Sequence, residues 1–331
     1  MADHRDVFDV SLMCRTLAAS RSGYYAWRGR DESNRSRSNR ALLERIRQEH
    51  ESSRQTYGSP RIHAALKAQG ESCSRKRVAR LMRESGIRSK ISRRHRRTTN
   101  SKHHHRVAEN LLSRDFSRAR PNEAWVSDIT YLPTDEGWLY LASTMDLFSR
   151  RVVGWSMGQT LDASLAVDAL QMAIDQRSPP AGLLHHSDRG VQYAADAFQE
   201  LLERHGVVPS MSGRGNCYDN AVQESFFHTL KTELCHHEHY RTRAEARGSV
   251  FEYIEVFYNR RRLHSTIGNL SPAAFERQHA LSTGTESPPP GPPPRGGSAP
   301  GAPRCAPASQ GLAPRGSPGT DKTNAVMQTG G

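Results

Sequence analysis

The order of secondary-structure patterns between residues 121 and 235 limits the fold of this chain more than any other feature. Runs rich in β-branched and aromatic residues predict three consecutive strands with short connections, as in an antiparallel meander. Helical and strand patterns then alternate. The predicted strands are 125–132, 138–148, 151–158, 182–187 and 207–211, and the predicted helices are 162–177, 195–205 and 220–235. Together they predict an α/β fold, a mixed sheet flanked by helices.

The N-terminal region has a helical and basic pattern. Residues 10–28 predict two short helices around a turn, with Ser20 as a candidate N-cap. Two interpretations remain open for this segment: a packing hairpin with aromatic residues in its core, or a DNA contact made by its arginines. Residues 31–40 are rich in Ser, Asn and Arg and predict a linker, followed by a helix over about residues 39–51.

Two further short helices, separated by a tight turn, are predicted between residues 59 and 86. Ser59 is a candidate cap for the first, which ends at Gly70, and Ser74 is a candidate cap for the second. This arrangement is typical of an all-α helix-turn-helix. The second helix carries the basic residues Arg75, Lys76, Arg77, Arg80 and Arg83. Such clustering suits a recognition helix, although a solvated basic face is the alternative.

The net charge of +13 favours a polyanionic partner. Residues 91–120 begin as a basic stretch with few apolar residues, so they cannot form a core there. We expect a connector that contacts phosphates through Arg93, Arg94, Arg96 and Arg97. The histidine run 103–105 has no cysteine at zinc spacing, so we expect it to be solvated and predict no zinc.

Cysteine usage and apolar patterning indicate the compartment. The five cysteines are scattered without a C-x-x-C pair, which argues against disulfides and for a reducing cytoplasm. The N-terminus lacks the apolar region of a signal peptide. No apolar run reaches the ~18 residues of a membrane span, so we expect no membrane contact. Residues 281–331 contain most of the 18 prolines and predict a disordered tail.

Three acidic residues occupy positions that favour a shared site. Asp128 lies in the middle of a predicted strand, where an ion is costly to bury without a partner. Asp188 follows the C-terminal end of another strand, where ligand sites gather in α/β folds. Glu224 lies on a predicted helix. We interpret these three as candidate ligands of a divalent cation. The alternative is three separate surface or salt-bridged acids.

Helical spacing places further polar groups around Glu224. Asn220, His228 and Lys231 share its face of the predicted helix, opposite the apolar stripe that contains Phe226. His186 lies two residues before Asp188. We therefore take Asn220, His228 and His186 as candidate neighbours of the metal ligands.

Four motifs then occur in order along the chain. They are W-x-x-D-I-T-Y from Trp125, H-S-D-R-G-x-Q-Y from His186, G-N-C-Y-D-N-A-x-x-E-S-F-F-x-x-L-K ending at Lys231, and Y-N-x-x-R-x-H-S-x-I-G-x-x-S-P from Tyr258. With these motifs, about residues 40–278 resemble the second open-reading-frame product of IS3-family insertion-sequence transposases. That family belongs to the superfamily of DDE transposases and retroviral integrases.

The resemblance implies a ribonuclease H-like core that binds two Mg²⁺ (or Mn²⁺) ions through Asp128, Asp188 and Glu224. It implies DNA cleavage at the ends of an insertion sequence, followed by strand transfer from the freed 3′-hydroxyl. Lys231 would contact DNA near the site, and the helix-turn-helix-like region would help to recognise the terminal inverted repeats. It also implies a homo-multimer on DNA, an upstream-frame protein or frameshift fusion, and a bacterial, nucleoid-associated location.

The resemblance and the composition together predict five segments. They are an N-terminal helical segment and linker (1–37), the helix-turn-helix-like region (38–90), a basic linker (91–120), the catalytic core (121–280) and the tail (281–331). Two departures from the family are visible: the chain has no heptad run, and its tail matches nothing in the family. Two other functions therefore remain open. One is a DNA-binding regulator with an inert core, and the other is a structure-specific nuclease on the same fold.

Overall fold

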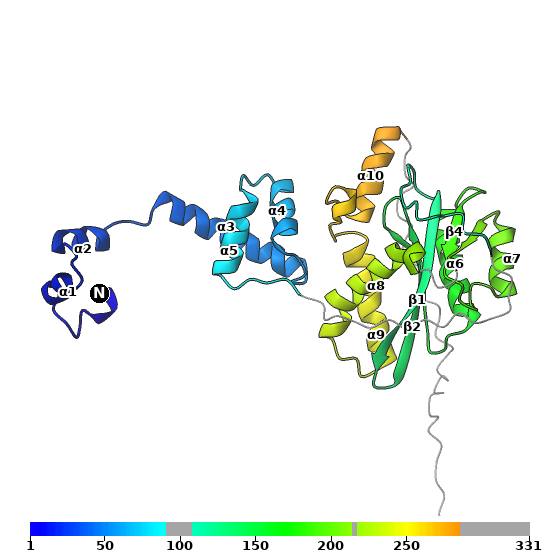
Figure 1. Cartoon of the computed structure of the whole chain (residues 1–331), viewed down its shortest axis with the longest axis horizontal. Coiled ribbons are helices and arrows are strands. Elements are labelled where there is room, and N and C mark those ends of the chain that lie inside the picture. Colours follow the sequence, from blue (N-terminus) through cyan, green and yellow to red (C-terminus); the bar gives the residue numbers. More distant parts are fainter. Residues whose placement is uncertain (91–107, 214–216, 285–331) are drawn as a thin grey trace, which may run out of the picture. The chain divides into compact units, whose positions relative to one another are not determined.

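The computed structural model describes residues 1–90, 108–213 and 217–284 (Figure 1). The chain divides into two units, Met1–Glu286 and Ser287–Gly331, and the second lies outside the described residues. Helix α10 (Pro272–Thr283) extends into the predicted tail, so the expected disorder is wrong for residues 281–283. Gly284 ends α10 with a φ of 67°, a left-handed conformation that glycine adopts without steric cost.

A five-stranded mixed sheet forms the centre of the core, in the order β3-β2-β1-β4-β5. β1 pairs with β2 and β2 with β3 in antiparallel orientation, which confirms the predicted meander. β4 pairs with β1, and β5 with β4, in parallel orientation. The strands are β1 (Ala124–Thr134), β2 (Gly137–Asp146), β3 (Val152–Gly158), β4 (Leu184–Ser187) and β5 (Val208–Met211).

Helices cover both faces of the sheet (Figure 1): α8 and α9 lie on one side, and α6 and α7 on the other. Their bounds are α6 (Ala163–Arg177), α7 (Asp196–Arg204), α8 (Ala221–Glu233) and α9 (Arg243–Phe251). Side chains alternate along β1 and explain both layers. Val126 and Leu132 pack in one apolar cluster with Phe226 of α8, whereas Trp125 packs in another with Leu170 of α6 and Phe198 of α7.

Gly154 on β3 lets α6 approach the sheet closely. A Cβ at this position would lie 2.2 Å from the Ala169 carbonyl oxygen and 2.6 Å from the Ala173 backbone nitrogen. Both contacts are with backbone atoms, which cannot move without shifting the helix. A side chain larger than hydrogen is therefore excluded here, and this contact fixes the spacing between α6 and the meander.

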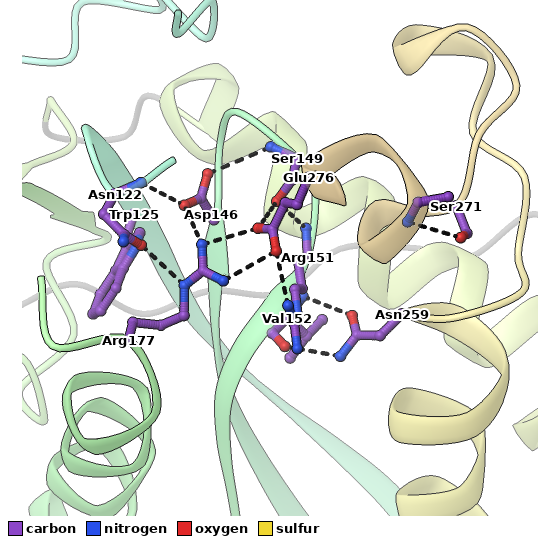
Figure 2. Close-up of polar contacts among 11 residues, drawn as sticks. Asn122, Trp125, Asp146, Ser149, Arg151, Val152, Arg177, Asn259, Ser271 and Glu276 are labelled. Atoms are coloured by element: carbon purple, nitrogen blue, oxygen red, sulfur yellow. Dashed lines mark hydrogen bonds and ion pairs between the residues drawn. The ribbon is translucent and has the colours of Figure 1, made fainter. Parts of the chain in front are cut away.

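A buried ionic network attaches α10 to the core (Figure 2). Glu276 of α10 accepts hydrogen bonds from both terminal nitrogens of Arg177, at 2.9 and 3.0 Å, and from Arg151 at 2.7 Å. The Ser149 hydroxyl also donates to Glu276, at 2.8 Å. Arg177 lies 3.7 Å from the fully buried Asp146, whose pKa burial raises to about 6 while Arg177 opposes the rise. The hydrogen bonds from Arg177, Arg151 and Ser149 compensate the buried Glu276 carboxylate for its lost contact with water.

The N-terminal helices partly match the predictions. Residues 10–28 form two short helices, and Ser20 caps the second by accepting from Gly23 N at 3.2 Å. Of the three aromatics in that segment only Tyr24 is buried, so the hairpin has a smaller core than a packing hairpin requires. The bounds here are η1 (Ala2–His4), α1 (Val10–Thr16) and α2 (Arg21–Arg28).

The predicted linker at residues 31–40 is wrong. Helix α3 (Asn34–Ser52) begins inside it, because the Ser33 hydroxyl accepts from Ser36 N at 3.1 Å and caps the first turn. The polar residues 34–40 are mostly exposed on this helix, and their composition is the same as that of a linker. Gly58, without a side-chain cap, precedes α4 (Ser59–Ala68), so Ser59 is the first helical residue and not the cap.

The remaining helices differ from the predictions at their ends. The helix predicted over residues 220–235 is flanked by two short 3₁₀ turns, η2 (Cys217–Asn220) and η3 (Cys235–His237). Helix α9 continues as the π-helix η4 (Glu252–Tyr258) and then ends. The last elements are α5 (Arg75–Glu84) and η5 (Ser265–Ile267). Within the described ranges, no helix is both long and apolar enough to cross a membrane.

Candidate active site

The register of the parallel ladder brings Asp128 and Asp188 to one place. The last pair of β1 with β4 is Val126 with His186, and each aspartate lies two residues beyond its member of that pair. Neighbouring strands are roughly 4.8 Å apart, so the two acids leave the ladder side by side. Asp128 also projects on the same sheet face as Val126, the face that α8 covers.

Two buried amides attach the start of α8 to the strands beside Asp128. Gln223 Nε2 donates to the Ser143 carbonyl at 3.0 Å, and Asn220 Nδ2 donates to the Ser127 carbonyl at 3.0 Å. Ser143 is the cross-strand partner of Asp128, and Ser127 precedes Asp128. Glu224 follows Gln223 in the first turn of α8, where the helix dipole favours a carboxylate. The fold therefore brings the third predicted acid to the same face of the sheet.

The three carboxylates do not form a closed cluster. Within the ranges that the structure describes, no group of three or more His, Cys, Asp or Glu side chains is arranged to hold a metal ion. Asp128 Oδ1 accepts from the Ile129 backbone nitrogen at 2.8 Å, and Asp188 Oδ1 accepts from the Gly190 nitrogen at 2.9 Å. Like charges repel, so three carboxylates approach a common ligand closely only when a cation offsets that repulsion.

The residues nevertheless fit a hard divalent cation. All three candidate ligands present carboxylate oxygens, which such cations prefer. Gly190 leaves space beside Asp188, since a Cβ there would lie 2.9 Å from Asp188 Oδ1. The hydroxyl of Tyr193 is buried with no hydrogen-bond partner among the described residues. The charges of Asp128 and Asp188 both act on this phenol, although burial is the larger cause of its raised pKa.

The charge of Asp128 acts on Lys231 of α8, which was predicted to share a helix face with Glu224. Burial lowers the pKa of the Lys231 ammonium, whereas Cys235 and Asp128 oppose that shift. Its Nζ lies 5.0 Å from the ring centroid of Tyr131, which favours the charged form through a cation–π contact. A cation held next to the acids can attract a phosphate toward them.

His185 and His186, on β4, make side-chain hydrogen bonds to neighbouring segments of the sheet. His186 is fully buried and makes hydrogen bonds to the Ser210 hydroxyl at 2.8 Å and the Ser212 hydroxyl at 3.1 Å. Burial lowers its pKa to about 4, so the ring is neutral at physiological pH. His185 bonds the Ser127 hydroxyl at 2.8 Å in the same way. With both nitrogens of His186 engaged, its contacts are with β5 and not with the acids.

Other acids near the site have structural partners that sequence spacing could not reveal. The buried Asp219 accepts from Arg114 Nε at 3.0 Å and Asn110 Nδ2 at 2.9 Å, which secures the residues before α8. At the other end of α8, Glu233 accepts from Arg262 Nε at 2.9 Å and Tyr253 Oη at 2.7 Å. Each of these arginines lies far from its acid in sequence, so sequence spacing alone could not reveal the two ion pairs.

Two residues of the site were missed by sequence reasoning, Gln223 and Tyr193. Gln223 lies three residues before the buried Phe226, a helical position where an apolar residue is expected, and this polar exception was the available signal. Tyr193 lies in the connection between β4 and α7, where no periodic pattern marks burial, and the available signal was its place as the last residue of the H-S-D-R-G-x-Q-Y motif. His228, a predicted neighbour of Glu224, is exposed on α8 and stays a prediction.

The basic residues of α5 divide into two groups. Arg75, Lys76 and Arg83 are exposed. Arg77 instead donates to Asn39 Oδ1 and Ser38 Oγ of α3, both at 2.8 Å, and Arg80 pairs with Glu84 at 2.8 Å. A DNA contact by any of them stays a prediction. The predicted phosphate contacts Arg93, Arg94, Arg96 and Arg97, and the histidine run at 103–105, lie outside the described residues.

Comparison with protein families gives the class. The integrase core domain matches residues 118–217 and 224–280, and the HTH-like domain matches residues 37–95. With the mixed sheet and its flanking helices, these matches define an integrase-core protein of ribonuclease H-like fold, with an HTH-like region before the core.

Two relatives narrow the class to a family. The "Insertion element IS600 uncharacterized 31 kDa protein" of Shigella sonnei is 46% identical over 271 residues, covering 82% of this chain and 100% of that protein. The "Transposase InsF for insertion sequence IS3A" of Escherichia coli (strain K12) is 45% identical over 284 residues, covering 83% of this chain and 96% of that protein. The chain belongs to the IS3 family of insertion-sequence transposases, and is therefore a DNA-binding enzyme of nuclease and transferase type.

A solved structure with a similar chain is the intasome of simian T-cell lymphotropic virus in complex with the PP2A regulatory subunit B56 gamma. The matching chain of that complex has 18% sequence identity to this chain and a TM-score of 0.43, and the match covers 71% of this chain and 76% of that chain.

Proposed function

We propose that this transposase cleaves and joins DNA at the terminal inverted repeats of an insertion sequence in a divalent-metal-dependent reaction. In this proposal Asp128, Asp188 and Glu224 hold Mg²⁺ or Mn²⁺. The observation that carries it is the shared offset of Asp128 and Asp188, each two residues beyond the last parallel pair, with α8 attached beside them. When bound, a pair of ions activates the attacking oxygen and stabilises the leaving one in phosphodiester chemistry.

The chain's own residues have distinct parts in this proposal. The three carboxylates would hold the ions at the DNA backbone. Lys231, half-buried on α8, holds a backbone phosphate and keeps its charge through Tyr131. Gln223 and Asn220 hold the start of α8, and with it Glu224, against β2 and β1. In-line displacement needs the reacting atoms held in position, so these bonds matter as much as the ligands themselves.

DNA recognition is assigned to the HTH-like region and to the basic linker. Exposure of Arg75 and Lys76 at the start of α5 supports this proposal, because a recognition helix contacts base edges with its N-terminal residues. We further propose that the enzyme acts as a homo-multimer on bacterial DNA, in the cytoplasm and the nucleoid, and that an upstream-frame protein or a frameshift fusion completes it. The five-segment division of the chain stays a prediction.

A strand-transfer assay tests the catalytic proposal. Wild-type chain, inverted-repeat DNA and Mg²⁺ or Mn²⁺ are expected to give joined products, and Asp188→Asn is expected to abolish them while repeat binding remains. Asp168→Asn, an exposed acid on α6, is the matched control and should remain active. Full activity in Asp188→Asn would end the proposal. Repeat binding without cleavage in any metal would favour the regulator, and hydrolysis without joining would favour the nuclease.

A further inference from the structure

Tyr193 carries a buried hydroxyl that the fold does not use. The side chain is 2% exposed, and its Oη has no hydrogen-bond partner among the described residues. Its ring packs edge-to-face on Phe198, with ring centroids 5.3 Å apart. A buried hydroxyl without a partner opposes folding, and phenylalanine would make the same ring contact without that penalty. The oxygen therefore calls for an explanation other than stability.

The backbone after Asp188 brings the Tyr193 ring close to the Asp188 carboxylate. Gly190 N donates to Asp188 Oδ1 at 2.9 Å, and Tyr193 N donates to Gly190 O at 3.0 Å. A Cβ on Gly190 would lie 2.9 Å from Asp188 Oδ1 and 3.6 Å from Tyr193 Cδ2. The carboxylate and the ring thus border the same small space. After burial, the charges of Asp128 and Asp188 are the remaining causes that raise the pKa of the phenol.

We propose that Tyr193 is a positioning residue for the metal site, whose hydroxyl donates a hydrogen bond to the Asp128–Asp188 pair when these carboxylates bind a divalent cation. This inference rests on the proposed function. Ligating carboxylates are held by hydrogen bonds from neighbouring groups, and loss of such a partner typically lowers metal affinity about 10–100-fold. Because burial raises the pKa of Tyr193, the phenol keeps its proton and remains a donor.

Tyr193→Phe separates this role from a structural one, since it removes one oxygen and keeps the ring. Full-length wild type and variant are compared in two measurements: the unfolding temperature in EDTA, and the Mn²⁺ dissociation constant from titrated thermal shift without DNA. The inference predicts an unfolding temperature in EDTA that is unchanged or higher. It also predicts Mn²⁺ binding weakened about ten-fold or more.

Tyr240→Phe is the matched control. Tyr240 is buried, but its Oη donates to Ser249 Oγ at 3.2 Å, on α9. Its loss should lower the unfolding temperature in EDTA and leave Mn²⁺ affinity unchanged, the opposite pattern. Equal Mn²⁺ affinity in Tyr193→Phe and wild type would overturn the inference alone. If wild type binds no more Mn²⁺ than Asp188→Asn, the proposed metal site fails, and the inference fails with it.

Discussion

Gln223 donates a hydrogen bond of 3.0 Å from Nε2 to the main-chain carbonyl of Ser143, the residue that pairs across the sheet with Asp128. Gln223 is fully buried and immediately precedes Glu224. Together with the bond from Asn220 to Ser127, this contact holds the helix of Glu224 against the two paired strands that contain Asp128 and Ser143.

Gln223→Leu keeps the volume of the side chain and removes this donor. We expect strand transfer to fall roughly 10²-fold, because a displacement of about 1 Å at a reacting centre has such an effect. Binding to inverted-repeat DNA should be unchanged. Ser143→Ala removes the Ser143 hydroxyl, a second acceptor for Gln223 Nε2, but keeps the carbonyl acceptor and should retain most activity. Wild-type strand transfer by Gln223→Leu would show that the bond has no role in positioning Glu224.

The two groups of basic residues on α5 should respond differently to substitution. Replacing the exposed Arg75 and Lys76 by alanine should weaken DNA binding and leave the unfolding temperature unchanged. Arg77→Ala should destabilise the fold by about 1 kcal/mol per lost bond, because Arg77 joins α5 to Asn39 and Ser38 of α3. Fluorescence anisotropy and thermal unfolding measure the two effects. A stable Arg77→Ala protein with the same binding loss would contradict this division.

The basic linker offers a prediction about salt. If Arg93, Arg94, Arg96 and Arg97 neutralise phosphates, replacing them by glutamine should flatten the plot of log binding constant against log salt concentration. The slope should decrease by about 0.9 for each lost contact with duplex DNA. Binding should weaken equally on specific and unrelated sequences. An unchanged slope would exclude phosphate contact by this segment.

Glu276 gives a prediction about pH. Burial tends to raise its pKa, but Arg177 and Arg151 outweigh burial and the net shift is downward. A lowered pKa stabilises the fold above the unfolded value of 4.5, and that contribution is lost as the pH falls through the folded pKa. Glu276→Gln should therefore lower the free energy of unfolding by about 1.5–3 kcal/mol at pH 7, since it removes the charged partner of Arg151 and one of the two charged partners of Arg177.

The loss in Glu276→Gln should shrink below about pH 4.5. The neighbouring Asp146 changes in the opposite sense, since its pKa is raised to about 6 and its contribution is lost as the pH rises. Asp146 is present in both chains, so comparing them largely removes it. Urea unfolding at pH 4 and pH 7 measures the difference. An equal loss at both values would contradict the ionic role of Glu276.

Much of this fold could be predicted from periodicity. The run of β-branched and aromatic residues predicted β1 with Asp128 in its middle. The end of a later predicted strand, β4, predicted the position of Asp188. The prediction of a linker at residues 31–40 was wrong because the polar residues on the exposed face of α3 have the composition of a loop. The ion pair of Asp219 with Arg114 joins segments far apart in sequence, so sequence spacing could not predict it. Burial of the Tyr193 hydroxyl without a hydrogen-bond partner results from tertiary packing, which hydrophobic periodicity does not predict.

In the proposed function, Asp128, Asp188 and Glu224 bind one metal centre. Fe²⁺ with ascorbate and peroxide, in place of Mg²⁺, cuts the main chain only near the bound ion. We predict three cuts, close to residues 128, 188 and 224, that Mg²⁺ suppresses by competition and that Asp188→Asn eliminates. Cuts at only one of these segments, or the same three cuts in Asp188→Asn, would contradict the shared site.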